Sequence, residues 1–139
     1  MTTPPVVTES AQAPRRLALR VVTMPRDTNH YGTIFGGVIL SYIDQAGYVE
    51  ARHHSKSTNQ KWVTVALDRV EFKQPVHLGD VVSLYTQTTR AGTTSVTVRV
   101  EVEAERFEDG QIVPVTEASI TLVCVDADGR PTPFRQAAR

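Results

Sequence analysis

The sequence has few of the features that mark disulfide-rich, nucleic-acid-binding or membrane proteins. A single cysteine, Cys124, occurs among its 139 residues, so no intramolecular disulfide can form. Fifteen basic and fifteen acidic residues cancel, which argues against a dedicated nucleic-acid-binding protein. The longest uncharged apolar run, residues 38–43, is too short to span a membrane, and the N-terminus does not resemble a signal peptide. We therefore expect one cytoplasmic domain with neither a membrane nor a nucleic acid as partner.

Several catalytic motifs are missing as well. The sequence contains no GxSxG nucleophile elbow, P-loop, CxxC pair or HExxH helix. The neighbours His53 and His54 would point about 100° apart on a helix, so they cannot easily share one ligand. We expect no metal site and no redox cofactor. Cys124 stands among apolar strand residues, which predicts a small core side chain.

Hydrophobic periodicity predicts one long helix and five strands. Residues 38–54 carry apolar residues at helical spacing. The expected strands are 17–24, 62–72, 81–89, 93–107 and 112–125. Within 93–107, Val and Ala occupy one face and Thr, Arg and Glu the other, so one face is buried and one is wetted. Turn signals at 77–80, 90–93 and 109–110 imply that consecutive strands are antiparallel neighbours.

This order predicts an α+β domain in which one helix lies across a five-stranded antiparallel sheet. The domain is expected over residues 15–133. Residues 1–14, rich in Thr, Pro and Ala, are expected to form a disordered tail, and 134–139 a short C-terminal tail. Free strand edges favour pairing with a second chain, so we expect a dimer.

Two features of the helical segment could carry chemistry. Asp44 borders the apolar stripe, where partial burial would make its carboxylate a better general base; alternatively it is a solvated residue on the helix flank. Gly36 and Gly37 open the helix without a capping Ser, Thr, Asp or Asn. Their amides would be free to hold an oxyanion or a phosphate, unless the glycines serve only to turn the chain.

Other polar residues are weaker candidates. Asn29 lies in a loop rich in turn residues, where it could orient a water or a carbonyl, or could simply shape the turn. Lys73, Arg90 and Arg130 lie near predicted strand ends and, together with Thr94 and Ser95, could hold phosphates. Scattered surface charge explains the same residues equally well.

Taken together, these segments resemble the hotdog-fold acyl-CoA thioesterases, closest to the bacterial broad-specificity acyl-CoA hydrolases and their animal cytosolic relatives. The resemblance rests on residues 24–37 (MPRDTNHYGTIFGG), 43–47 (IDQAG), 63–66 (VTVA), 70–75 (VEFKQP), 79–82 (GDVV) and 125–131 (VDADGRP). It covers residues 17–133. The polar segment 55–61 and the N-terminal tail are longer than in the closest bacterial relatives.

The resemblance implies a fold, an assembly and roles for several residues. It implies a hotdog fold with the sheet wrapped around the helix, homodimers with active sites at the interface, and a hexamer built as a trimer of dimers. Asn29 and Asp44 would act from different chains, and the amide of Gly37 would bind the oxyanion. Coenzyme A would contact Gly36, Phe72, Lys73, Arg90, Ser95 and Arg130.

The sequence therefore predicts an acyl-CoA thioesterase that needs no cofactor beyond the coenzyme A of its substrate. Whether Asp44 activates water or attacks directly remains open at this point. Two alternatives are also open. One is an acyl-thioester hydratase or dehydratase, for which His30 is the only histidine near the glycine loop; the other is a non-catalytic acyl-CoA-binding module.

Overall fold

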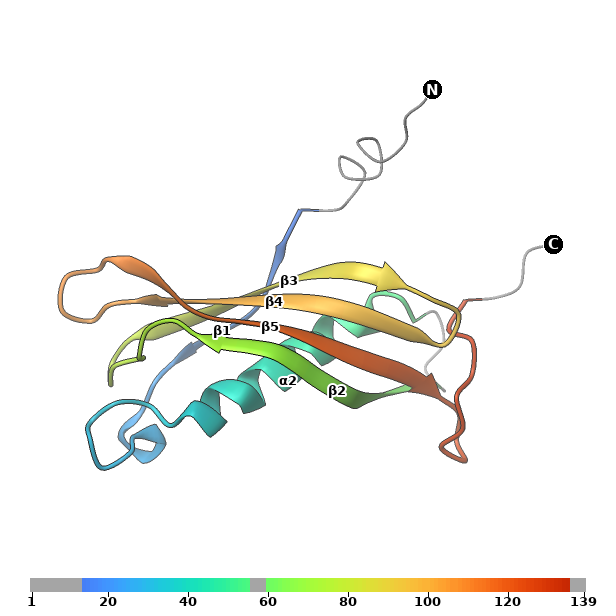
Figure 1. Ribbon diagram of the computed structural model, residues 1–139, viewed down its shortest axis with the longest axis horizontal. Helices are drawn as coiled ribbons and strands as arrows, with labels where there is room; N and C mark the ends of the chain where they lie inside the picture. The colour runs from blue at the N-terminus through green and yellow to red at the C-terminus, as the bar shows by residue number, and fades with distance from the viewer. Residues whose placement is uncertain (1–13, 56–59, 136–139) are drawn as a thin grey trace, which may run out of the picture.

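The computed structural model describes residues 14–55 and 60–135 and contains one five-stranded antiparallel sheet and one long helix (Figure 1). The strands are β1 (Arg16–Val22), β2 (Lys61–Phe72), β3 (Val81–Ala91), β4 (Ser95–Glu105) and β5 (Ile112–Val125). A 3-10 turn η1 (Pro25–Asp27) precedes the helix α2 (Gly36–Arg52). The predicted α+β architecture is confirmed. Most of the predicted tails and of the polar segment after the helix (residues 1–13, 56–59 and 136–139) lie outside the described residues.

The strand order is β1-β3-β4-β5-β2, so one expected pairing is wrong. The hairpins β3–β4 and β4–β5 form as predicted. The turn at residues 77–80, however, does not join neighbours, because β4 and β5 lie between β2 and β3. The chain leaves β2 at one edge and crosses the end of the sheet to β3. Asp80, which is fully buried, fixes this crossing by accepting hydrogen bonds from the backbone amides of His77 and Phe107.

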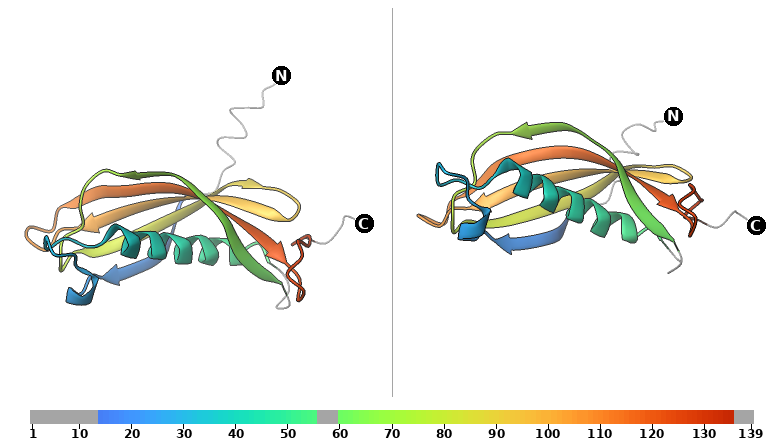
Figure 2. Two further views of the ribbon diagram at one scale, coloured as in Figure 1. Left: turned by 60° about the horizontal axis from the view of Figure 1, so that its bottom comes forward. Right: turned by 90° about the horizontal axis from the view of Figure 1, so that it is seen from below.

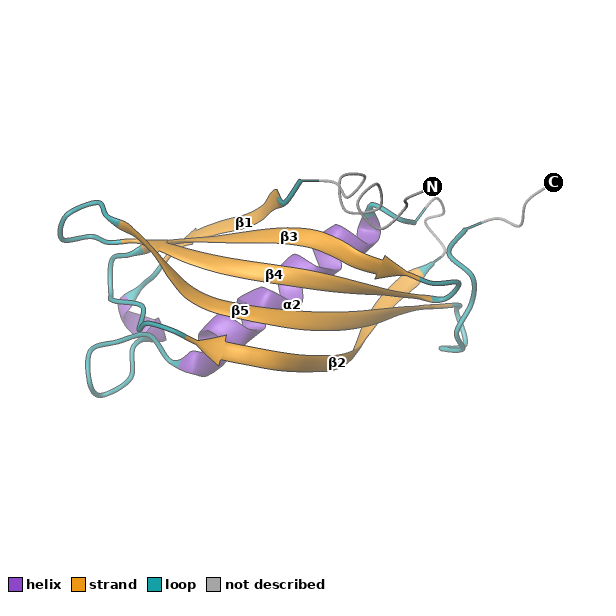
Figure 3. Cartoon of the chain, turned by 45° about the horizontal axis from the view of Figure 1, so that its top comes forward, coloured by secondary structure: helices purple, strands orange, loops and turns teal. Residues whose placement is uncertain are grey.

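The sheet curves around α2, which contacts all five strands (Figures 2 and 3). The helix buries one stripe, formed by Ile39, Ile43, Ala46, Gly47, Glu50 and Ala51. A Cβ atom at Gly47 would lie 2.8 Å from Cγ2 of Ile120, so this glycine is needed for the close approach of α2 to β5. Because the helix is packed this tightly, the side chains on its flanks are held at definite positions over the sheet.

The other face of the sheet is polar, as the alternation along β4 predicts. Arg99 lies 2.9 Å from both Glu101 and Glu117, and Arg15 lies 3.0 Å from Glu101 and stacks 3.9 Å above the ring of Tyr85. These partly exposed ion pairs contribute little stability individually. They show which face of the sheet carries charge and which contacts the helix.

The core extends beyond the predicted end of the domain. Phe134 is 2% exposed, and its ring packs 5.2 Å from the ring of Trp62 and 5.7 Å from the ring of His54. Its backbone amide donates to the carbonyl of Thr93. The packed chain therefore continues to at least Phe134, one residue past the predicted boundary at 133. Cys124 is fully buried and unpaired, as predicted.

Candidate functional site

The start of α2 presents free backbone amides. Phe35 occupies the N-cap position, and its side chain makes no capping hydrogen bond. Among the described residues, no acceptor is found for the amides of Gly36 and Gly37. The positive end of the helix dipole lies at the same place. An ideal Cβ at Gly37 would meet no described atom within 4 Å, so there is open space beside this residue.

Asn29 shapes the loop that leads into the helix. Its side-chain Oδ1 accepts from the amides of Tyr31 (2.8 Å) and Thr33 (3.2 Å), and its Nδ2 donates to Thr33 Oγ1 at 3.0 Å. The turn interpretation of Asn29 is therefore correct within one chain. These bonds also fix the position of the side chain, which is half-buried. His30, the only histidine of this loop, is exposed and packs 4.0 Å from the ring of Tyr31.

A buried ion pair between Arg106 and Asp80 stabilises the segment to which the Asn29 loop is attached. The amide of Ile34 donates to the carbonyl of Val76, so the loop is attached to the segment that follows β2. Arg106 donates to the carbonyl of Pro75 and to Asp80, at 2.8 Å in each case. Because both charged groups are largely buried and hydrogen-bonded, they hold the segment firmly. Arg106 is thus a structural support that the sequence analysis did not identify.

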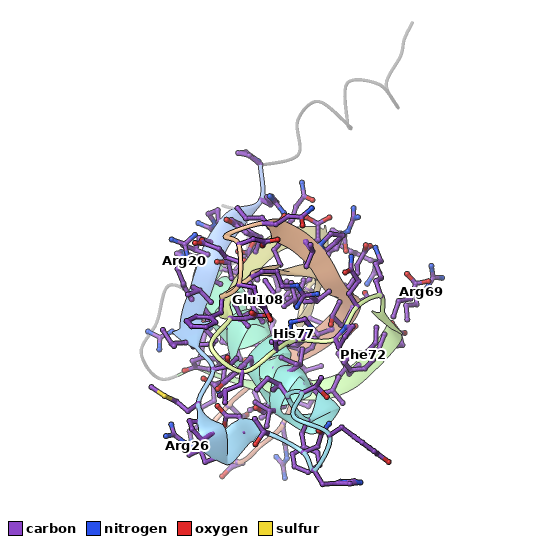
Figure 4. All side chains as sticks on the ribbon, turned by 90° about the vertical axis from the view of Figure 1, so that its left-hand side faces the viewer. Arg20, Arg26, Arg69, Phe72, His77 and Glu108 are labelled. Atoms are coloured by element: carbon purple, nitrogen blue, oxygen red, sulfur yellow. The ribbon has the colours of Figure 1, made fainter. Side chains whose placement is uncertain are left out.

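A pocket of about 300 Å³ lies beside the start of the helix. Gly36, Phe72 and Lys73 line it, so three of the predicted substrate-binding residues come together. The ring of Phe72 would lie 3.5 Å from a Cβ at Gly36. Strand β2 is irregular just before this point. Arg69 has φ of 55° and its side chain points outward (Figure 4), and the β2–β5 register shifts between Asp68 and Glu71. A bulge of this kind redirects the residues that follow it.

Asp44 lies on the flank of α2 that faces β2, in a second groove of about 530 Å³. The groove runs between α2 and β2 and is lined by Asp44, Gln45, Tyr48, Val49, Trp62, Val63 and Thr64. Thr64 Oγ1 donates to Oδ1 of Asp44 at 2.5 Å. Asp44 itself is exposed in the single chain, so the expected partial burial is not present there. The carboxylate is nevertheless oriented at the mouth of a mainly apolar groove.

Comparison with known proteins identifies the family. A model described as the thioesterase superfamily matches residues 31–110, which include the glycine loop, α2 and the groove. The chain belongs to the thioesterase superfamily.

Named relatives of this thioesterase-superfamily chain agree with the match. It is 38% identical over 121 residues to the acyl-CoA thioester hydrolase YciA of Salmonella typhimurium, covering 85% of this chain and 89% of the relative. A crystal structure of a hexameric hotdog fold thioesterase of Campylobacter jejuni superposes with a TM-score of 0.79 at 43% identity, over 86% and 90% of the two chains. An acyl-CoA hydrolase of Staphylococcus aureus, solved with butyryl coenzyme A and coenzyme A, gives 0.74 at 27% identity, over 86% and 71%. The fold is the hotdog fold that the resemblance implied.

The remaining predicted substrate-binding residues of this superfamily member lie elsewhere. Arg90 and Ser95 are near the β3–β4 turn, and Arg130 is in the turn after β5. Phe72 pairs with Thr116 of β5 and Ser95 with Val123, so the two groups are separated by about 23 Å along this strand. Within one chain they therefore do not form a single site with Gly36.

One group of potential metal ligands occurs among residues 14–55 and 60–135. His77, Asp80 and Glu108 place ligand atoms within 4.8 Å of one another. The Asp80 carboxylate, however, already accepts hydrogen bonds from Arg106 and two backbone amides, so the protein itself satisfies it. None of the helices within residues 14–55 and 60–135 has the length and apolarity required to span a bilayer.

A buried carboxylate on the helix was missed by the sequence analysis. Glu50 is 5% exposed. Its Oε1 accepts from Arg16 (2.8 Å) and Thr86 (2.9 Å), and its Oε2 accepts from Thr88 (2.7 Å). Burial acts to raise the pKa of Glu50, but these hydrogen bonds outweigh it and lower the pKa. Because the hydroxyl proton of Thr88 is donated to Glu50, the contact at 2.9 Å with Nε2 of His54 requires the imidazole to be the donor.

Replacing Glu50 by Gln is expected to lower the free energy of unfolding at pH 7 by about 1.5–3 kcal/mol, because hydrogen bonds to a charged group are lost. A carboxyl whose pKa is lowered by folding stabilises the protein above its unfolded pKa and loses that contribution as pH falls through the folded pKa. The difference in free energy of unfolding between wild type and the Glu50→Gln variant should therefore become smaller below about pH 4.5. Urea denaturation between pH 3 and pH 7 measures it.

The matched control for this prediction is Glu101→Gln, which removes a partly exposed carboxylate from the ion pairs on β4. We expect a change of less than about 1 kcal/mol there. A Glu50→Gln protein with wild-type stability at every pH would contradict the assigned role of the hydrogen bonds.

Proposed function

We propose that the chain is an acyl-CoA thioesterase that hydrolyses acyl-CoA to a free carboxylic acid and coenzyme A. The observation that carries the proposal is the Asp44 carboxylate, oriented by Thr64 at the mouth of an apolar groove in a member of the thioesterase superfamily. An acyl-CoA fits both features of this site. Its acyl chain is apolar like the groove, and a carboxylate can attack its thioester carbonyl directly or activate a water that does so.

The proposed chemistry divides the work between the start of α2 and its middle. The free amide of Gly37 would donate to the thioester oxygen and stabilise the negative charge that develops there. Asp44 would either take a proton from the attacking water or attack the carbonyl carbon to form an anhydride, which water then hydrolyses. Asn29 would orient the water or the thioester. In the first route the proton that Asp44 takes from water passes to the sulfur of coenzyme A as the carbon–sulfur bond breaks. In the second route coenzyme A leaves as the thiolate, and the proton that neutralises it is released when water opens the anhydride.

We propose that a second copy of the chain completes the site. Gly37 and Asp44 are seven residues apart, which is about 10 Å along one helix. If Asp44 attacks directly, one carbonyl group connects the amide donor and the attacking oxygen only over about 7 Å, so in that route the two groups act from different chains. The edge strand β2, which pairs only with β5 among the described strands, exposes Val63 and Val65 beside the groove and is suited to pair with another copy.

We extend this assembly to a hexamer built as a trimer of dimers, since the relative from Campylobacter jejuni is described as hexameric. The proposed reaction takes place in the cytoplasm and needs no metal or other cofactor. Coenzyme A enters only as part of the substrate. No nucleic acid or membrane is required as a partner.

The direct test is release of free thiol from a series of acyl-CoAs, from acetyl to palmitoyl, by the purified chain. We expect release with at least one class of chain lengths. A folded protein that binds acyl-CoA tightly without releasing coenzyme A would instead support a binding module. Hydration of an enoyl-CoA in place of thiol release would support the hydratase alternative.

A further inference from the structure

Strand β2 contains a strained residue near its end. Among residues 14–55 and 60–135, Arg69 is the only non-glycine residue with a positive φ, a conformation that glycine adopts freely and that a side chain with a Cβ adopts only with strain. Asp68 and Glu71 are paired with β5, and Arg69 and Val70 between them face a single residue of that strand. This two-against-one count is a β-bulge. A strained residue that persists at a bulge points to a role outside the fold.

The bulge directs its two residues to opposite sides. Val70 is half-buried and packs against the core. Arg69 is exposed, and its side chain points away from the body of the protein (Figure 4). Its guanidinium has no hydrogen-bond or ion-pair partner in the part of the chain that the structure describes. Arg15, Arg99 and Arg106, in contrast, are each paired with a carboxylate. The strained backbone therefore positions a cation whose charge the described chain does not use.

This cation lies close to the pocket at the start of α2. Phe72 and Lys73 follow Arg69 by three and four residues, and both line the pocket together with Gly36. At most about 10–13 Å of strand therefore separates Arg69 from these two residues. The Nζ atom of Lys73, itself partly exposed, lies 3.4 Å from Glu117 and supplies a second positive charge beside the pocket. The pocket thus combines apolar walls, a free helix amide and two nearby cations.

The left-handed conformation also limits how far a second copy can pair along β2. An edge strand pairs through the regular row of amides and carbonyls that extended residues present, and a residue with positive φ turns these groups out of the row. The exposed apolar residues of this edge, Val63 and Val65, lie before Arg69. Pairing along them is therefore interrupted at Arg69, which leaves its guanidinium at the end of the paired segment and on the side of the pocket.

We propose that Arg69 binds a phosphate group of the coenzyme A portion of the substrate. This inference rests on the proposed function, in which the amide of Gly37 binds the thioester oxygen. Coenzyme A carries a 5′-diphosphate and a 3′-phosphate, and an uncharged pantetheine arm joins them to the thioester. A guanidinium binds phosphate through two parallel N–H···O bonds, which makes arginine well suited to this contact. Arg69 thereby distinguishes thioesters of coenzyme A from thioesters of pantetheine.

Arg69→Gly separates this role from a structural one, because it removes the cation and relieves the strain together. We expect KM for an acyl-CoA to rise about tenfold with kcat unchanged, since the phosphate is held equally in the ground state and the transition state. KM for the pantetheine thioester of the same acid should not change, and the urea midpoint should be no lower than that of wild type. Arg69→Lys, which keeps the charge, should recover part of the affinity. An equal rise in KM for both substrates, or unchanged KM for both, would overturn the proposal.

The matched control is Arg20→Ala, which removes an exposed arginine from β1 at the opposite edge of the sheet (Figure 4). Its KM for both substrates should equal that of wild type. A similar rise in KM for acyl-CoA in both variants would indicate general attraction by positive charge and would contradict a specific contact. Thioesters of 3′-dephospho-coenzyme A then locate the contact: an effect of Arg69→Gly that disappears with them assigns the 3′-phosphate, and one that persists assigns the diphosphate.

A binding measurement separates this proposal from the proposed activity. Titration calorimetry with coenzyme A and with pantetheine needs no hydrolysis. We expect wild type to bind coenzyme A about tenfold more tightly than Arg69→Gly does, and the two proteins to bind pantetheine equally. This result without thiol release from any acyl-CoA would refute the enzyme and retain the phosphate contact. Thiol release by wild type, together with equal affinity of both proteins for coenzyme A, would refute the role of Arg69 alone.

Discussion

An Asp44→Asn enzyme is expected to lose at least about 10³-fold in kcat for acyl-CoA hydrolysis while remaining folded. The amide keeps the Oδ1 atom that accepts from Thr64, so the local geometry survives. It lacks the negative charge that either a general base or a nucleophile requires. Because Asp44 is exposed in the single chain, the substitution should change the free energy of unfolding of the protein by less than about 1 kcal/mol. Steady-state thiol release and urea denaturation measure the two effects.

The control for this prediction is Asp68→Asn, which neutralises an exposed carboxylate on β2 away from the groove. Its kcat should stay within a factor of two of wild type. Wild-type turnover by the Asp44→Asn enzyme would remove Asp44 from the mechanism. A large loss in both variants would indicate that net charge, and not a specific carboxylate, controls the rate.

The sequence predicts those parts of the site that depend on local pattern. Gly36 and Gly37 stand where the apolar period changes from strand to helix, so the uncapped helix start could be located before the structure. Asp44 could be placed on the helix flank from its distance to the buried stripe. In each case the decisive information lies within a few residues of the chain.

The partner of Asp44 could not be predicted in this way. Thr64 is one of several threonines in β-rich sequence, and it faces Asp44 because β2 lies at the sheet edge next to α2. The register with β5 also shifts between Thr64 and Ala66. Such a bulge changes which side chains face inward, and strand alternation alone does not reveal it.

Glu50 and Phe134 were missed for a different reason. A glutamate on a helix reads as a solvated residue, and its burial depends on Arg16, Thr86 and Thr88, all more than thirty residues away. Phe134 follows two prolines that suggest the end of the domain, yet its ring completes the core beside Trp62. Long-range contacts, not local propensity, decide both positions.

The separation of the proposed catalytic groups within one chain leads to a second prediction with a large effect. Neither Asp44→Asn nor Asn29→Asp should hydrolyse acyl-CoA at more than about one hundredth of the wild-type rate. Asn29→Asp keeps the Oδ1 acceptor that shapes the loop, so the variant should fold. If Asp44 of one chain acts with Asn29 of its partner, a dimer that contains one chain of each variant has one intact site and one doubly altered site.

Random mixing of the two variants by co-expression would make half of the dimers mixed, and half of the sites in those dimers intact. We therefore expect about a quarter of the wild-type activity from two proteins that are each nearly inactive. Activity no greater than the sum of the separate variants would place both groups in one chain. Regained activity would instead show that the thioester is held between two chains.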